Sequence, residues 1–169
     1  MIHLLSMLML LVFPAMVILA ALKDVASYTI PNWIPLTLIA AFPLAALAVG
    51  LPLPAMGTAA LAGVIALFAG MAMFAARWIG GGDAKLFAAA ALWLGLPAAT
   101  SYIFFTCLAG GLLAGLLLAM RSARMRPVLA AGPGWLAKLS EPGGAVPYGV
   151  AIAVGALAAF PLSPLAATH

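Results

Sequence analysis

Long apolar runs, each close to the length of a membrane crossing, dominate this sequence and restrict what it can fold into. Only 6% of the 169 residues are charged and 67% are hydrophobic, so the polar residues are too few to cover a soluble domain. Lipid must therefore be the solvent, and in lipid every backbone polar group has to be paired within the protein. A helix satisfies this requirement and crosses a bilayer in about 20 residues. The pattern predicts an all-α polytopic membrane protein.

Proline, glycine and charged residues divide the chain into six apolar segments. The fourth segment is short for a full crossing and ends at Gly95-Leu96-Pro97. Glycines recur in the third and fifth segments, where they allow close helix contacts. No basic residue precedes Lys23, which argues against a cleaved signal peptide. We expect one membrane domain over residues 1–169, a six-helix bundle with spans at about 2–22, 33–49, 56–76, 84–96, 99–120 and 146–165.

The basic residues fall in alternate connections between these segments. Lys23 follows the first span, Arg77 and Lys85 flank the connection after the third, and the rest follow the fifth. All seven Lys and Arg then lie on one side of the membrane. Basic connections face the cytoplasm, so both termini are expected outside it. A five- or seven-span arrangement would split the basic residues, which after the fifth span are Arg121, Arg124, Arg126 and Lys138.

Two of the three acidic residues lie at span ends on that cytoplasmic side. Asp24 follows the first span, and Asp83 precedes the fourth, at the expected N-cap of its helix. An ionisable group at membrane depth is costly and by default marks a functional site. The third acid, Glu141, lies in the largest connection, residues 121–145, and is expected to be a solvated charge beside a short surface helix.

Two carboxyl groups at one depth can act as an acid–base pair. Carboxylates that meet do not both ionise cheaply and come to share a proton. The ionised group then takes a proton from water while the protonated one donates to a carbonyl oxygen, as in aspartic proteases. The helix dipole favours charge on Asp83, which makes it the better candidate for the base. Gly80, Gly81 and Gly82 before it allow positive φ and close approach of a peptide.

Other interpretations stay open. Asp83 alone is a helix cap, and Asp24 alone pairs with Lys23 or lies at the membrane interface. Paired acids in membranes also serve proton relays, so a small transporter or proton-coupled subunit is the alternative function. A transport path places its acids near mid-membrane in discontinuous helices, whereas both aspartates here lie at one edge.

Further classes are excluded by what the chain lacks. Cys107 is the single cysteine, which excludes a zinc cluster or a disulfide framework, and we expect it to be a small buried hydrophobe. The basic residues are not interleaved with aromatic ones, so the sequence carries no nucleic-acid-binding pattern.

Three motifs resemble those of the prepilin peptidases, also called type IV leader peptidases. Gly80-Gly81-Gly82-Asp83 fits the G-x-G-D signature of membrane aspartyl proteases, and Ala84-Lys85-Leu86 extends it to G-x-G-D-x-K-L. Asp24 followed by Ile30-Pro31-Asn32 is similar to the family's first aspartate motif. Val146-Pro147-Tyr148-Gly149 resembles its P-[YF]-G segment. The motifs occur in the family's order and span residues 24–149.

The resemblance implies a membrane aspartic endopeptidase that removes the cytoplasmic leader of type IV prepilins or pseudopilins at the inner face of the bacterial inner membrane. It implies catalysis by Asp24 and Asp83 without a metal or cofactor. The implied partners are the prepilin substrate, the lipid bilayer and the pilus assembly machinery, with no nucleic acid. Substrate binding is assigned to the remaining motif residues: Pro31, Asn32, Gly80, Gly81, Gly82, Lys85, Pro147, Tyr148 and Gly149.

The chain departs from the long members of that family. Those members carry a zinc domain with paired cysteines, and many also methylate the new pilin N-terminus. With Cys107 alone, this chain resembles the short form found with tight-adherence (Flp-type) pili, for which methyl transfer is not implied. The archaeal preflagellin peptidases share the aspartate motifs, so a preflagellin is the other substrate that the resemblance leaves open.

Overall fold

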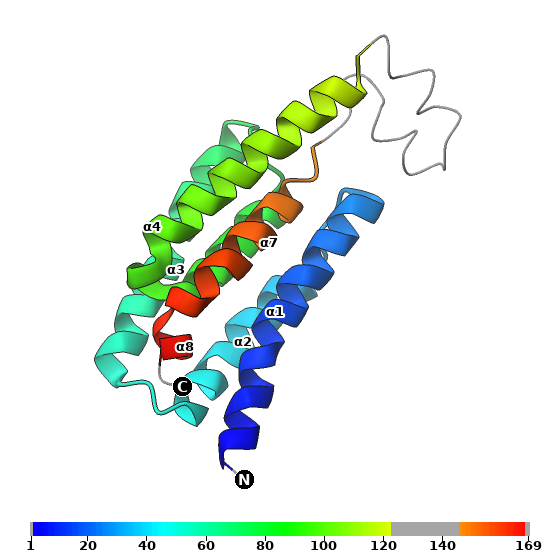
Figure 1. Ribbon diagram of the computed structural model, residues 1–169. Coiled ribbons are helices and arrows are strands. Elements are labelled where there is room, and N and C mark those ends of the chain that lie inside the picture. The colour runs from blue at the N-terminus through cyan, green and yellow to red at the C-terminus, as the bar shows by residue number, and fades with distance from the viewer. Residues whose placement is uncertain (1, 123–145, 168–169) are drawn as a thin grey trace.

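The computed structural model describes residues 2–122 and 146–167, and these residues form a bundle of helices (Figure 1). No strand occurs within the described ranges, so the all-helical class expected from the sequence is confirmed. The elements are α1 (Ile2–Ser27), α2 (Trp33–Ala48), α3 (Leu53–Ala75), α4 (Gly81–Met120), α7 (Tyr148–Ala159), the 3-10 helix η1 (Phe160–Leu162) and α8 (Pro164–Ala167).

Most of these elements have the length and hydropathy of membrane spans. Within the described residues, four helical segments are long and apolar enough to cross: Ser6–Ser27, Leu53–Ala75, Gly81–Met120 and Tyr148–Ala167. Helix α2 is apolar but shorter, at 16 residues. Large apolar side chains such as Phe68 and Leu118 point outward and are exposed, as expected for a protein whose solvent is lipid.

Helix α4 is bent at Gly95, whose φ of 66° and ψ of 176° are not helical. Pro97 follows and cannot donate a helical hydrogen bond. Beyond the bend, the Tyr102 ring stacks on Phe87 with centroids 5.0 Å apart, and its hydroxyl donates to the Phe87 carbonyl at 3.3 Å. In a straight helix these two residues would be about 22 Å apart. The second arm of α4 therefore folds back along the first.

Small residues set the distances between the helices. A Cβ on Gly70 of α3 would lie 3.1 Å from Ala84 of α4, and one on Gly155 of α7 would lie 2.7 Å from the Thr106 nitrogen. Between α4 and α2, Trp93 is buried and its indole N–H donates to the Leu38 carbonyl at 2.8 Å. The expectation for Cys107 is wrong: its thiol is exposed on the second arm of α4.

The ends of the helices gather at two opposite ends of the bundle (Figure 1). The C-terminal ends of α1, α3 and α4 and the start of α4 lie at one end, and the start of α1 and helix α8 lie at the other. Lys23, Arg77, Lys85 and Arg121 belong to the first end by their positions on these elements. The expected surface helix and the residues Arg124, Arg126, Lys138 and Glu141 lie outside the described residues.

Candidate active site

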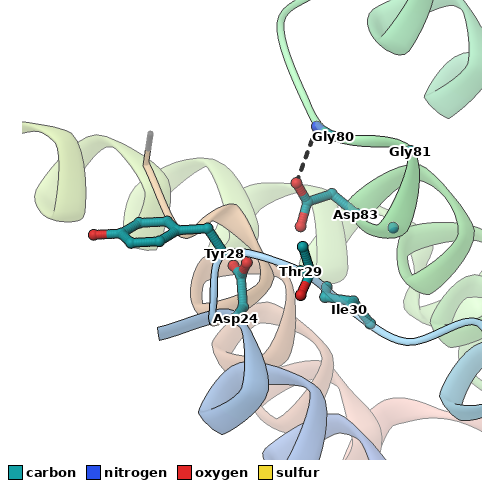
Figure 2. A pocket seen from close by; sticks show the side chains of 8 residues that line it. Asp24, Tyr28, Thr29, Ile30, Gly80, Gly81 and Asp83 are labelled. Atoms are coloured by element: carbon teal, nitrogen blue, oxygen red, sulfur yellow. Dashed lines mark hydrogen bonds between the residues drawn. The ribbon is translucent and has the colours of Figure 1, made fainter. Parts of the chain in front are cut away.

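A pocket of about 220 Å³ lies between the C-terminal end of α1 and the turn that leads into α4. Two segments far apart in the sequence form its walls, the residues after α1 and the glycine turn. At about 30 Å³ per molecule, the pocket has room for several waters. Figure 2 shows most of the residues in its wall, which are Asp24, Tyr28, Thr29, Ile30, Gly80, Gly81, Gly82 and Asp83.

Asp24 reaches this pocket from the last turn of α1 and is only 4% exposed. Its Oδ2 accepts a hydrogen bond of 2.7 Å from the backbone N–H of Gly149, the second residue of α7. The start of a helix offers unpaired N–H groups and a favourable dipole to an anion. The neighbouring Lys23 is exposed whereas Asp24 is buried, so the two side chains lie in different surroundings.

Asp83 is buried in the first turn of α4, at 8% exposure. The expectation that it is the N-cap is wrong, because α4 begins at Gly81 and Gly80 is the N-cap. As the third helical residue, Asp83 reaches back and accepts the Gly80 N–H at 3.0 Å through Oδ2, as the acidic residue of a capping box does. Its Oδ1 is buried and has no hydrogen-bond partner among the described residues, which marks a place for a polar ligand group.

The two carboxyl groups face the same space (Figure 2). The Asp83 carboxyl acts electrostatically on Asp24, and the Gly149 N–H interacts with both carboxyl groups. Each aspartate therefore lies against the N-terminus of a helix, Asp24 against α7 and Asp83 within α4. Because the helix dipole acts on both, it does not single out Asp83 as the base. The two carboxyl groups therefore line one pocket and interact electrostatically.

Close contact with Ile30 accounts for the need for glycine at two motif positions, Gly82 and Gly149. Ile30 is buried, and a Cβ on Gly82 would lie 3.0 Å from its Cβ and 3.2 Å from its carbonyl oxygen. A Cβ on Gly149 would lie 2.8 Å from the Ile30 Cδ1 and equally close to the Asp24 Oδ2. The glycines make space for Ile30 and the carboxylate. The expected positive φ at Gly80–Gly82 is wrong, since the glycines with positive φ in the described ranges are Gly50 and Gly95.

The remaining expected substrate-binding residues do not line this pocket. The Lys85 ammonium donates to the side-chain oxygen of Asn32 at 2.8 Å, beside the pocket. Asn32 is the N-cap residue of α2 but makes no side-chain capping bond. Pro147 is buried at the start of α7, and Tyr148 lines a separate apolar groove of about 460 Å³. Pro31 is half-buried and lies between the wall residue Ile30 and Asn32.

Three wall residues, Tyr28, Thr29 and Ile30, were not expected as site residues. Tyr28 has a φ of 53°, and its N–H donates to the Asp24 carbonyl at 2.8 Å, so it ends α1 with a tight turn. A non-glycine residue in this conformation costs on the order of 1 kcal/mol. The Thr29 hydroxyl lies 2.9 Å from that of Ser27. The available signal was their position, because Tyr28 and Thr29 lie between Asp24 and the Ile30-Pro31-Asn32 motif and Ile30 is its first residue.

No group of three or more His, Cys, Asp or Glu side chains among residues 2–122 and 146–167 is arranged to hold a metal ion. The site as described consists of two carboxyl groups with backbone N–H donors. The glycines beside them contribute no side chains to the pocket wall.

Comparison with known proteins identifies one family. The sequence model of the type IV leader peptidase family matches residues 11–115, a region that includes both Asp24 and Asp83. No curated protein and no solved structure matches the chain. The matched region begins in α1 and ends in the second arm of α4.

Proposed function

The chain belongs to the type IV leader peptidase family, and on that premise we propose that Asp24 and Asp83 act as one catalytic unit that cuts prepilin leaders. The observation that carries the proposal is the burial of both carboxyl groups in one pocket, contributed by motifs far apart in the sequence. Burial of two acids side by side is costly, and such perturbed pairs cluster at functional sites.

The proposed reaction is hydrolysis of one peptide bond by a water held between the carboxyl groups. The ionised carboxylate takes a proton from this water as its oxygen attacks the carbonyl carbon, and the protonated carboxyl donates its proton to the carbonyl oxygen. The tetrahedral intermediate then breaks its C–N bond. The nitrogen leaves with the proton taken from the water, the intermediate's hydroxyl returns its proton, and the products are an acid and an amine. No cofactor enters this balance.

The peptide is proposed to reach the pair over Gly80 and Gly81. Gly80 is exposed and both residues line the pocket, so the backbone of this wall is uncovered. Gly82, in contrast, is covered by Ile30. An extended substrate segment can therefore lie along the first two glycines, with its carbonyl near the unpaired Oδ1 of Asp83.

The proposed topology has six spans, with both arms of α4 counted separately. The bend at Gly95 and the return of the second arm along the first support that count. The basic residues then all lie on the cytoplasmic side with the carboxyl pair, and both termini lie outside. This places the pair where the leader of an inner-membrane prepilin meets its apolar helix.

Within the family, we propose a Flp-type prepilin or pseudopilin as the substrate. The support is the resemblance of the motifs around Asp24 and Asp83 to those of the prepilin peptidases. The bilayer and the pilus assembly machinery are the proposed partners, and N-methylation forms no part of the proposal.

The test is cleavage of a Flp-type prepilin by the purified protein in detergent. Asp24→Asn and Asp83→Asn keep size and hydrogen-bonding capacity but cannot share the proton, so each should lower the rate by orders of magnitude. The double variant should be little worse, because residues that act as a unit are not additive. Activity of the wild-type protein should follow a bell against pH, since one carboxyl has to be ionised and the other protonated.

A shift on a gel measures the cut, and mass spectrometry locates it. Thermal unfolding of each variant provides the control for folding. A well-folded Asp24→Asn variant that cuts at a near wild-type rate would be incompatible with the proposed pair.

A further inference from the structure

The hydrogen bond between Lys85 and Asn32 joins two segments that each carry one catalytic aspartate in the proposed function. Lys85 lies one half-turn after Asp83 on α4, and Asn32 ends the loop that begins after Asp24. The residues are 53 positions apart in sequence, and their side chains meet at 2.8 Å. Neither residue lies in the pocket wall. The geometry therefore does not support direct contact between either residue and the reacting atoms.

We propose that Lys85 is a positioning residue whose hydrogen bond to Asn32 sets the separation of the two carboxyl groups. The inference rests on the proposed function, because it assigns a role within that reaction. It replaces the expectation that Lys85 and Asn32 bind substrate.

The loop that Asn32 ends is the same loop that packs against the glycine turn. Ile30, two residues before Asn32, lies against the backbone of Gly82 and against Gly149. A shift of this loop away from α4 therefore moves Ile30 out of its place beside Asp83 and loosens its contact with the residue that holds Asp24. The Asn32 oxygen is available to Lys85 because it does not cap α2.

A counter-charge role for Lys85 has less support. The Asp83 carboxyl accepts its hydrogen bond from the Gly80 N–H, whereas the Lys85 ammonium donates to Asn32. The Lys85 side chain is exposed, and its ammonium is directed to a neutral amide. A hydrogen bond with one charged partner is stronger than a neutral one, which suits a contact that holds two segments together.

The kinetic experiment compares Lys85→Met, Asn32→Leu and the double variant in prepilin cleavage. Each single change should lower kcat by about tenfold to a hundredfold, because small misplacements of catalytic groups have effects of that size. KM should stay within about twofold of wild type in this reading, in which no substrate contact is lost. The double variant should match the single ones, since both changes remove the same bond.

Two conservative variants test whether the hydrogen bond itself matters, and one control variant tests the loss of a surface lysine. Lys85→Arg keeps a charged donor and Asn32→Asp keeps an acceptor, so each should restore most of kcat. Lys23→Met is the matched control, because Lys23 is also an exposed lysine at this end of the bundle and its side chain makes no bond across segments within residues 2–122 and 146–167. Its kcat should equal that of wild type. The pH profile of Asn32→Leu, which removes no charge, should coincide with that of Lys85→Met.

A second measurement does not depend on cleavage. In a Cys107→Ser background, spin labels at Trp33→Cys and Trp78→Cys lie on the two joined segments, and both positions are exposed. Pulsed electron paramagnetic resonance should give a broader and longer distance distribution once Lys85→Met is added. An unchanged distribution would overturn the proposal, as would additive losses that appear in KM. Failure of the wild-type protein to cut any prepilin would sink the proposed function, while the label distances would still decide the Lys85–Asn32 link.

Discussion

At the scale of single residues, the carboxyl pair depends on two backbone N–H groups. Gly80 donates to Asp83 and Gly149 donates to Asp24, in each case to Oδ2. Backbone donors are fixed by the helices that carry them, so within the described part of the chain each carboxyl is held without a charged partner. The Oδ1 of Asp83 is left buried and unpaired within the described residues. An unpaired buried oxygen of this kind costs free energy in the unliganded protein, and a ligand that donates a hydrogen bond to it would remove that cost.

We expect Gly149→Ala to impair catalysis more than any comparable glycine change. Its added methyl group would lie 2.8 Å from the Asp24 Oδ2 and from the Ile30 Cδ1. The carboxylate must then move or lose its N–H donor, and the rate should fall by about a hundredfold, the scale of misplaced catalytic groups. Gly111→Ala is the matched control, because nothing lies within 4 Å of the methyl group there.

Steady-state cleavage and thermal unfolding of both variants are the measurements. Adding Ile30→Val to Gly149→Ala removes the Cδ1 atom and should recover stability more than activity, since the contact with Asp24 remains. Wild-type kinetics for Gly149→Ala would contradict the assigned contact.

Much of the site could be predicted at this scale, and the failures have a common cause. The rarity of acids in an apolar chain singled out Asp24 and Asp83, and the structure brings both into one pocket. The backbone conformation of Gly80–Gly82 and the start of α4 were predicted wrongly. Three consecutive glycines leave both the helix start and φ undetermined, so neither the N-cap at Gly80 nor the contact of Gly82 with Ile30 could be known. Long-range contacts leave no local pattern.

At the scale of elements, the turn within α4 depends on one residue. Gly95 has a φ of 66°, which side chains other than glycine adopt at a cost. Hydropathy predicted a break at Gly95-Leu96-Pro97 but could not predict that the second arm packs back on Phe87 through Tyr102. That contact depends on the direction in which the chain leaves the turn.

We therefore expect Gly95→Ala to destabilise the protein by roughly 1–3 kcal/mol, the cost of a backbone conformation that is essentially restricted to glycine. Its methyl group would meet only the rings of Pro97 and Pro164 at ordinary contact distance, so the effect should come from the backbone. Gly57→Ala, where nothing lies within 4 Å, should be neutral or slightly stabilising. Thermal or denaturant unfolding in detergent gives the comparison, and equal stability of the two variants would refute it.

At the scale of the whole molecule, hydropathy and charge predict more than any local motif. The helical class follows from composition alone, and the ends that carry Lys23, Arg77, Lys85 and Arg121 gather at one end of the bundle (Figure 1). Which side of the membrane that end faces is a property of insertion, and it stays a prediction.

Cysteine accessibility in a Cys107→Ser background tests that orientation. Ser27→Cys, Trp78→Cys and Ser122→Cys should react with a membrane-impermeant thiol reagent from the cytoplasmic side only, because basic connections are retained there. Leu53→Cys, exposed at the opposite end of the bundle, should react from the other side only. Periplasmic labelling at any of the first three positions would rule out the six-span topology.

The bond from Gly149 to Asp24 also has a consequence for how the protein is made. Ribosomes synthesise Asp24 and Asp83 well before Gly149, because α7 follows both arms of α4 in the chain. A nascent chain thus contains both acids while the donor that orients Asp24 is still missing. On the proposed function, hydrolytic competence arises with the last helix, so neighbouring nascent membrane chains are spared while this one is being inserted.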